Sequence, residues 1–202
     1  DPVAAGAHGH LRHRHSGARM KELILGGARS GKSGYAEQRA RESGCRVTYI
    51  ATATPGDAEM QQRIAEHRQR RPGEWLVVEE AVALAEALAR HAAPERCVIV
   101  DCLTLWLSNI LFPQALPGAR SPSDAGLFAR ERVALLDLVP RLPGRVFFVS
   151  NEVGLGVVPL GAGTRRYGDE AGRLNQDLAQ LCERVTFMVA GLPWTLKGPG
   201  VA

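Results

Sequence analysis

The chain has 202 residues, of which 45% are hydrophobic, 23% are charged and 22 are glycines. This length and composition fit one globular domain with a substantial core and exclude coiled-coil, collagen-like and wholly disordered chains. The longest apolar stretch, residues 97–112, contains polar residues and is shorter than the ~20 residues of a membrane-spanning helix. The four cysteines form no C-x-x-C pair. We therefore expect that the chain does not insert into a membrane. We also expect that its thiols are reduced and that its location is cytoplasmic.

The formal net charge of +4 is not by itself a sign of nucleic-acid binding, because half of it lies in residues 1–19. Three arginines stand there against one aspartate, which leaves +2 for residues 20–202. The rest of the chain is therefore nearly balanced, and we expect no nucleic-acid partner. Residues 1–19 hold four of the six histidines and have neither apolar periodicity nor the apolar run of a secretory signal. We predict a disordered, His-rich leader, with metal binding as the alternative, followed by a single domain over residues 20–202.

From residue 20 onward, short apolar runs alternate with amphipathic stretches, which is typical of a buried parallel sheet with helical connections. Strands are predicted for residues 22–25, 46–51, 75–79, 97–101, 145–150 and 184–190, with a short edge strand at 194–197. Helices are predicted for residues 32–42, 58–70, 81–91, 103–111, 125–139 and 173–181. Residues 113–124, rich in Pro, Gly and Ser, are predicted to form a surface loop. The expected fold is α/β, with three layers and a mostly parallel central sheet.

The first predicted strand leads directly into GGARSGKS, which satisfies the P-loop pattern G-x-x-x-x-G-K-[ST]. Its residues are Gly26, Gly27, Ala28, Arg29, Ser30, Gly31, Lys32 and Ser33. In such a loop, backbone N–H groups face phosphate oxygens, and the following helix adds the positive end of its dipole. We expect Lys32 to contact the outer phosphates and Ser33 to offer its hydroxyl to Mg²⁺. A glycine-rich turn with a chance lysine is the alternative, which the flanking strand and helix disfavour.

A P-loop protein also needs an acidic group at the end of a neighbouring buried strand. The run VIVD ends in Asp101, which is the candidate for the metal site, although it could also cap the next helix. The N-K-x-D motif that reads guanine in GTPase switches is absent from the sequence. A small-molecule kinase and a recombinase-type ATPase both remain open. The balanced charge and the 5% aromatic content disfavour a groove for single-stranded DNA.

Residues 63–72, RIAEHRQRRP, surround one histidine with arginines. Neighbouring positive charge would lower the pKa of His67 and keep its ring neutral, as a nucleophile requires. The same arginines could neutralise a triphosphate under attack. The competing interpretation is a solvated, arginine-rich helix that ends at Pro72, and composition alone does not decide between the two.

Several segments, in this order, resemble those of one known family. GGARSGKS, YIATA, RIAEHRQRRP, VIVDCLTLWLSNIL, VSNEVGLGVVP and DEAGRLNQDLA are similar to the bifunctional adenosylcobinamide kinase and adenosylcobinamide-phosphate guanylyltransferase of cobalamin synthesis, over about residues 23–197. The resemblance implies a RecA-like P-loop fold and a homotrimer. It also implies two reactions: adenosylcobinamide is phosphorylated with ATP or GTP, and GMP is then transferred from GTP to the new phosphate. A P-loop small-molecule kinase without guanylyltransferase activity is the alternative.

The resemblance also implies which residues act. His67 would be the catalytic histidine that becomes guanylylated, and Lys32 the catalytic lysine. Besides the P-loop, the nucleotide-binding residues would be Ala51, Thr52, Ala53, Arg68, Gln69, Arg70, Arg71, Glu79 and Asp101.

Independently of the resemblance, residues 51–53, Glu79 and Asp101 follow or end predicted strands, where open α/β sheets bind ligands. Asn151 and Glu152, after the fifth strand, are candidate substrate-side groups, with loop hydrogen bonding as the alternative. Arg173 and Asn175 could act likewise, but a salt-bridged, structural Arg173 is the stronger interpretation.

Overall fold

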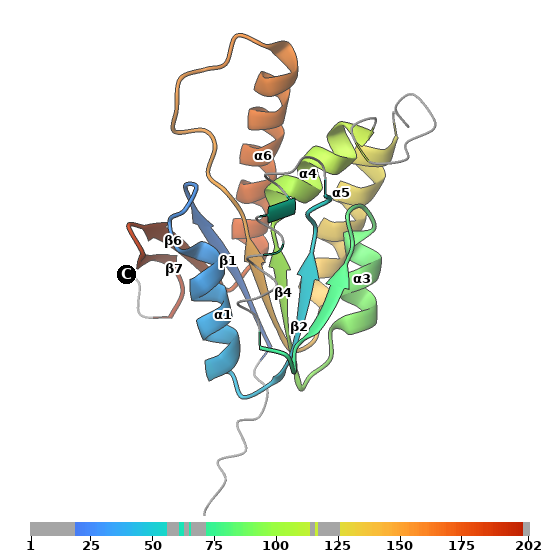
Figure 1. Cartoon of the computed structure of the whole chain (residues 1–202), viewed down its shortest axis with the longest axis vertical. Helices are drawn as coiled ribbons and strands as arrows, with labels where there is room; N and C mark the ends of the chain where they lie inside the picture. Colours follow the sequence, from blue (N-terminus) through green and yellow to red (C-terminus); the bar gives the residue numbers. More distant parts are fainter. Residues whose placement is uncertain are drawn as a thin grey trace, which may run out of the picture.

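The computed structural model describes residues 19–55, 61–62, 65, 72–113, 116 and 126–199, in which strands and helices alternate along the chain (Figure 1). The strands are β1 (Met20–Gly26), β2 (Arg46–Ala51), β3 (Leu76–Glu79), β4 (Arg96–Asp101), β5 (Arg145–Val149), β6 (Arg184–Val189) and β7 (Leu192–Lys197). The helices are α1 (Lys32–Glu42), α3 (Leu84–His91), α4 (Leu103–Leu111), α5 (Leu127–Leu138) with the 3₁₀ turn η2 (Val139–Arg141), and α6 (Ala162–Leu181). None of the helices in the described part of the chain is long and apolar enough to cross a membrane.

The seven strands form one sheet in the order β3-β2-β4-β5-β1-β6-β7. The first six are parallel to their neighbours, and β7 runs antiparallel to β6 at the edge. Strands β4 and β5 therefore lie between β1 and β2, although β1 and β2 are neighbours in the sequence. All six parallel strands end at the same edge of the sheet, which we call the carboxyl edge.

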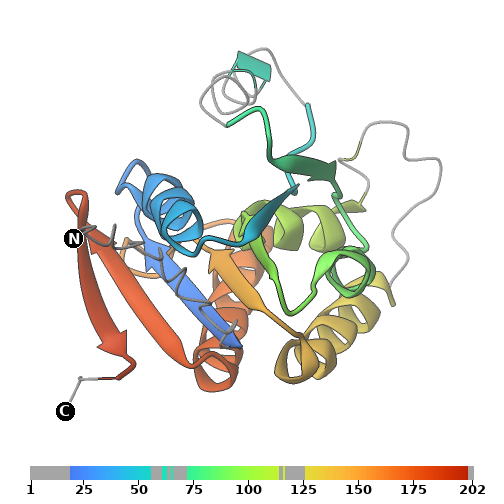
Figure 2. The same ribbon diagram turned by 90° about the horizontal axis from the view of Figure 1, so that it is seen from below.

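The sheet lies between two helical layers of unequal size (Figure 2). Helix α1 covers one face, and helices α3, α4, α5 and α6 cover the other. The side chains of strand β4 pack on both faces of the sheet. Val98 and Val100 lie in the core on the four-helix side, whereas Cys97 and Ile99 lie in the core with α1. Successive side chains point to opposite faces, and both faces are covered, so β4 is a continuous apolar run. The structure confirms the expected three-layer α/β fold.

The predicted strands are all present, and β7 confirms the expected edge strand. One helix boundary was wrong: the helix predicted for residues 173–181 begins at Ala162. Residues 162–172 include three glycines, and among these eleven residues only Ala171 is buried. No apolar periodicity therefore marks this half of the helix. The predicted leader lies almost entirely outside the described residues, as do most of the predicted 58–70 helix and of the 113–124 loop.

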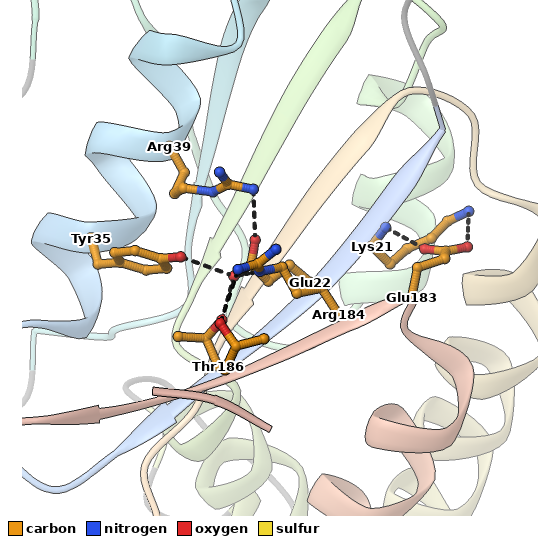
Figure 3. A network of polar contacts seen from close by, with 8 residues as sticks. Lys21, Glu22, Tyr35, Arg39, Glu183, Arg184 and Thr186 are labelled. Carbon is orange, nitrogen blue, oxygen red and sulfur yellow. Dashed lines mark hydrogen bonds and ion pairs between the residues drawn. The ribbon is translucent and has the colours of Figure 1, made fainter. Parts of the chain in front are cut away.

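A buried carboxylate links three elements near the start of β1 (Figure 3). Glu22 is fully buried and accepts hydrogen bonds from Thr186 at 2.7 Å and Tyr35 at 3.4 Å. It also pairs with Arg39 of α1 at 3.3 Å and with Arg184 of β6 at 3.4 Å. Because a buried charge is costly without its partners, this network favours one alignment of α1 and β6 on β1, the strand that leads into the P-loop.

Candidate active site

The P-loop connects β1 to α1 at the carboxyl edge, as its sequence predicts. A Cβ on Gly26 would lie 2.6 Å from the carbonyl oxygen of Met188, so the backbone leaves room for glycine only. Gly31, the residue before α1, has a φ of 96° in the left-handed region that favours glycine. These two positions explain why the loop needs its glycines and how the chain curves into α1.

Lys32 lies inside this curve. Its Nζ donates to the carbonyl oxygen of Gly27 at 2.5 Å and lies 3.5 Å from the Ser30 hydroxyl. The side chain is buried, and burial lowers its pKa, while Cys102 and Asp101 oppose that shift. Lys32 begins α1 and Asp101 ends β4, so the P-loop lysine and the predicted metal-side acid both stand at the carboxyl edge of the sheet.

The acidic side of the site is formed by three neighbouring strands. Ala51 pairs in register with Glu79 of β3 and with Asp101 of β4, so the three residues form a row at the carboxyl edge. The Tyr49 hydroxyl donates to the Asp101 carboxylate. Tyr49 is buried, so this contact fixes the carboxylate from within the sheet.

Thr52 joins the ends of β2 and β4. Its hydroxyl donates to the carbonyl oxygen of Cys102 at 2.7 Å and accepts from the Cys102 N–H at 2.9 Å. Asn109 of α4 donates to the Thr52 carbonyl oxygen at 3.0 Å. The Thr52 hydroxyl is thus engaged within the protein. Burial raises the pKa of the Cys102 thiol to about 11, which makes it a poor nucleophile at neutral pH.

The end of β5 lies beside the P-loop. The N–H of Glu152 donates to the Gly26 carbonyl oxygen at 3.0 Å, and the N–H of Ser150 donates to Ile24 at 2.9 Å. Glu152 also accepts from the N–H of Gly154 at 2.7 Å, so the loop hydrogen bonding expected as the alternative for this residue is present. Arg173 pairs with Glu170 at 2.6 Å, as its structural interpretation predicts.

The residues assigned to the metal supply oxygen donors of the kind that Mg²⁺ prefers. Ser33 stands in the first turn of α1, and Asp101 ends β4. A hydroxyl and a carboxylate, completed by phosphate oxygens and water, match the way in which proteins hold Mg²⁺ with nucleotides. Among the described residues there is no cluster of three or more His, Cys, Asp or Glu side chains that would hold a metal by itself.

The other half of the predicted site lies outside the described residues. This half comprises His67, Arg68, Gln69, Arg70 and Arg71. Their assignment stays a prediction.

Two residues near the site were not predicted from the sequence. Tyr49 contacts Asp101, but its place in an alternating apolar strand marks it as a core residue only. Gly191, in the turn between β6 and β7, donates its N–H to the Ser30 carbonyl oxygen at 3.1 Å. A glycine in a hairpin turn indicates the turn and not the loop against which it packs.

Comparisons with known proteins show what the chain is similar to. The sequence profile of a family described as "Cobinamide kinase / cobinamide phosphate guanyltransferase" matches residues 22–196. A Pseudomonas aeruginosa protein named bifunctional adenosylcobalamin biosynthesis protein CobP is 58% identical over 182 residues, which are 89% of this chain and 98% of that protein. The Escherichia coli K12 protein named bifunctional adenosylcobalamin biosynthesis protein CobU is 38% identical over 184 residues, 88% of this chain and 100% of that protein. The solved structure of the RadB recombinase has a TM-score of 0.43 at 16% identity, covering 83% of this chain and 73% of that one.

Proposed function

The chain belongs to the cobinamide kinase / cobinamide phosphate guanyltransferase family, and we propose that it phosphorylates adenosylcobinamide with ATP or GTP and then transfers GMP from GTP to the product. The product would be adenosylcobinamide-GDP. The observation that carries the proposal is the P-loop with its buried Lys32, at the edge of the sheet where β4 ends in Asp101, in a chain of this family.

In the first reaction, a hydroxyl oxygen of adenosylcobinamide attacks the γ-phosphorus of the nucleotide. The bond from that phosphorus to the β-phosphate oxygen breaks, and the hydroxyl loses its proton. Such a transfer needs positioning and charge stabilisation more than covalent help. The P-loop N–H groups and Lys32 supply both, because Lys32 is held inside the curve of the loop where a phosphate would bind.

Ser33 and Asp101 would hold Mg²⁺, with Tyr49 orienting the Asp101 carboxylate. When bound, the ion neutralises charge on the phosphate oxygens.

In the second reaction, His67 would carry the GMP group. A ring nitrogen attacks the α-phosphorus of GTP, and pyrophosphate leaves. A phosphate oxygen of adenosylcobinamide phosphate then attacks the same phosphorus and releases the histidine. The arginine-rich segment around His67 supports this assignment, because its charges would offset those of the triphosphate.

The test of the proposal is covalent labelling with GTP that carries label on its α-phosphate. We expect acid-labile, base-stable label on the parent protein, which is the stability pattern of a phosphoramidate. His67→Asn removes the nucleophilic nitrogen and should abolish both the label and guanylyl transfer, while adenosylcobinamide phosphorylation continues.

His91→Asn is the matched control, because His91 is the last residue of α3, where a histidine typically serves the helix dipole. This variant should label like the parent. A parent protein that phosphorylates adenosylcobinamide but takes up no label would favour the kinase without guanylyltransferase activity. Label that survives His67→Asn would place the nucleophile elsewhere.

We also propose that the enzyme is a cytoplasmic homotrimer. The four cysteines, all of which lie among the described residues, are free thiols, as the reducing cytoplasm favours. An apolar run that follows Glu152 is exposed to solvent, with Leu155 at 81%, Val157 at 95% and Leu160 at 97%. Contiguous apolar surface of this kind marks interaction sites, which supports contact with a second copy of the chain.

A further inference from the structure

Asn151 stands between the two halves of the phosphate site. Strand β5 lies between β1, which leads into the P-loop, and β4, which ends in Asp101. Val149 pairs in register with both Ile24 of β1 and Asp101 of β4. The chain then continues along the start of the P-loop through the hydrogen bond from the Glu152 N–H to Gly26. Asn151 therefore leaves the sheet between the phosphate loop and the metal-side acid.

Asn151 is held in place through its side chain and through its backbone. Its side-chain Nδ2 donates to the Thr104 hydroxyl at 2.7 Å, and its backbone carbonyl oxygen accepts from Nδ2 of Asn175 on α6 at 3.5 Å. Asn175 is in turn fixed by the Ser150 hydroxyl, which donates to its Oδ1 at 2.8 Å. Tyr167 of α6 donates to the Thr104 carbonyl oxygen at 2.9 Å. Thr104 of α4 thus orients the Asn151 carboxamide, while α6 fixes the backbone of both Asn151 and Thr104 at the carboxyl edge.

This orientation leaves hydrogen-bonding capacity on Asn151. Nδ2 carries two N–H groups, and among the residues that the structure describes Thr104 is its only acceptor. A neutral N–H donor at this place can bind a phosphate oxygen without adding charge, whereas a carboxylate would repel it. The transferred phosphoryl group gains stabilisation from donors aimed at its oxygens.

We propose that Asn151 binds the terminal phosphate of the nucleoside triphosphate and so distinguishes triphosphate from diphosphate at the P-loop. This inference rests on the proposed function for the identity of the reaction, but it concerns nucleotide binding alone. The P-loop and Lys32 hold the phosphates that both nucleotides share. Asn151, two residues beyond the β5 partner of Asp101, contacts the phosphate that is lost in the kinase step.

The experiment compares the affinities of two nucleotides, GDP and the non-hydrolysable β,γ-imido analogue of GTP, in the presence of Mg²⁺. For Asn151→Asp we expect the Kd of GDP to stay within about 2-fold of the parent value. The analogue should bind about 10- to 100-fold more weakly, as is common when a hydrogen bond to a charged group is replaced by repulsion. Asn151→Ala should shift the same ratio in the same direction by a smaller factor, and it provides the test if the Asp variant is unstable.

Asn109→Ala is the matched control, because the Asn109 amide donates to the carbonyl oxygens of Thr52 and Ala81 within the protein. It should lower the thermal midpoint and leave the ratio of the two affinities unchanged. Equal losses for GDP and the analogue in the Asn151 variants, or no loss for either, would overturn the inference. A parent protein that binds both nucleotides but does not phosphorylate adenosylcobinamide would contradict the proposed function. The ratio of the Kd values of the analogue and GDP would still test the role of Asn151.

Discussion

At the scale of single residues, Lys32 combines burial with charge. Its ammonium group is surrounded by the carbonyl oxygen and hydroxyl of its own loop, and burial lowers its pKa. A bound phosphate would favour the charged form, so nucleotide binding should raise the pKa of Lys32 again. Lys32 should also attract a phosphate more strongly than an exposed lysine would, because the interaction takes place away from bulk water.

Lys32→Ala should therefore reduce both proposed reactions. We expect losses of roughly 10²–10³ in rate, as is usual when one charge contact to a transition state is removed. Initial rates of adenosylcobinamide phosphorylation and of guanylyl transfer provide the measurement. Lys197→Ala is the control, since Lys197 donates to two carbonyl oxygens near the end of α6. A kinase rate within a few-fold of the parent in the Lys32 variant would contradict the assignment.

At the scale of elements, the turn between β6 and β7 is part of the P-loop's support. The Gly191 N–H donates to Ser30, and a Cβ on Gly31 would lie 3.3 Å from the Gly191 Cα. Chain segments about 160 residues apart are therefore in contact at the P-loop. The loop's shape depends on the conformation of this turn, where Ala190 and Gly191 both have positive φ.

Gly191→Ala tests this dependence. Its φ of 80° is strained for alanine, and we expect the free energy of unfolding to fall by about 1 kcal/mol. We also expect GTP to bind several-fold more weakly, because the turn would shift against Ser30. Gly44→Ala is the matched control, since Gly44 has a φ of 67° and, like Gly191, nothing within 4 Å of the position that an added Cβ would take. In urea unfolding, this control should lose a similar free energy of unfolding, and it should keep the GTP affinity of the parent. Equal GTP affinities in the parent, Gly191→Ala and Gly44→Ala would show that the turn does not support the loop.

At the scale of the whole molecule, buried thiols couple stability to alkaline pH. Burial raises the pKa of Cys97 and Cys182 to about 12 and that of Cys102 to about 11, well above the ordinary value of about 8.5 for an exposed thiol. Above pH 9 the unfolded thiols lose protons that the folded thiols keep, so the unfolded state binds fewer protons and stability falls as pH rises. Lys21 acts in the opposite direction, because burial lowers its pKa.

We expect the free energy of unfolding to fall between pH 9 and 10.5, with each thiol contributing up to about 1.4 kcal/mol per pH unit. Urea unfolding at a series of pH values measures this slope. Cys182→Ala should make the slope shallower by about the share of one thiol, even if its stability at pH 8 is lower. A slope that is identical in the two proteins would show that Cys182 ionises equally in the folded and unfolded states.

The proposed trimer is tested at the exposed apolar run. Leu160→Glu places a charge in the surface that a second copy would cover, so we expect the parent to have the mass of a trimer and this variant to dissociate. Light scattering on a sizing column measures the mass. Val133→Glu is the control, because Val133 is 54% exposed on α5, a different element from this run. A monomeric parent, or a trimeric Leu160→Glu protein, would contradict the proposed contact.

Local sequence patterns determined most of the elements and half of the site. The P-loop could be located because its glycines, Lys32 and Ser33 lie within eight residues, between an apolar run and an amphipathic helix. Asp101 and Glu79 could be placed at the carboxyl edge because each ends a short apolar run. Such signals need only neighbouring residues. The first half of α6 could not be predicted, because exposed residues and glycines carry no periodic signal.

Only the tertiary structure decided which strand ends are neighbours. The order β3-β2-β4-β5-β1-β6-β7 places Asn151 between the P-loop and Asp101, and it brings Gly191 against Ser30. Strand order depends on which helices pack on which face of the sheet, and these contacts join residues far apart in the chain. A pattern with a period of two or 3.6 residues tells which face of an element is buried but not which element covers it. The residues that we propose to act on the phosphates were thus visible in the sequence, whereas the groups that contact them, Tyr49 and the Gly191 turn among them, emerged only from the fold.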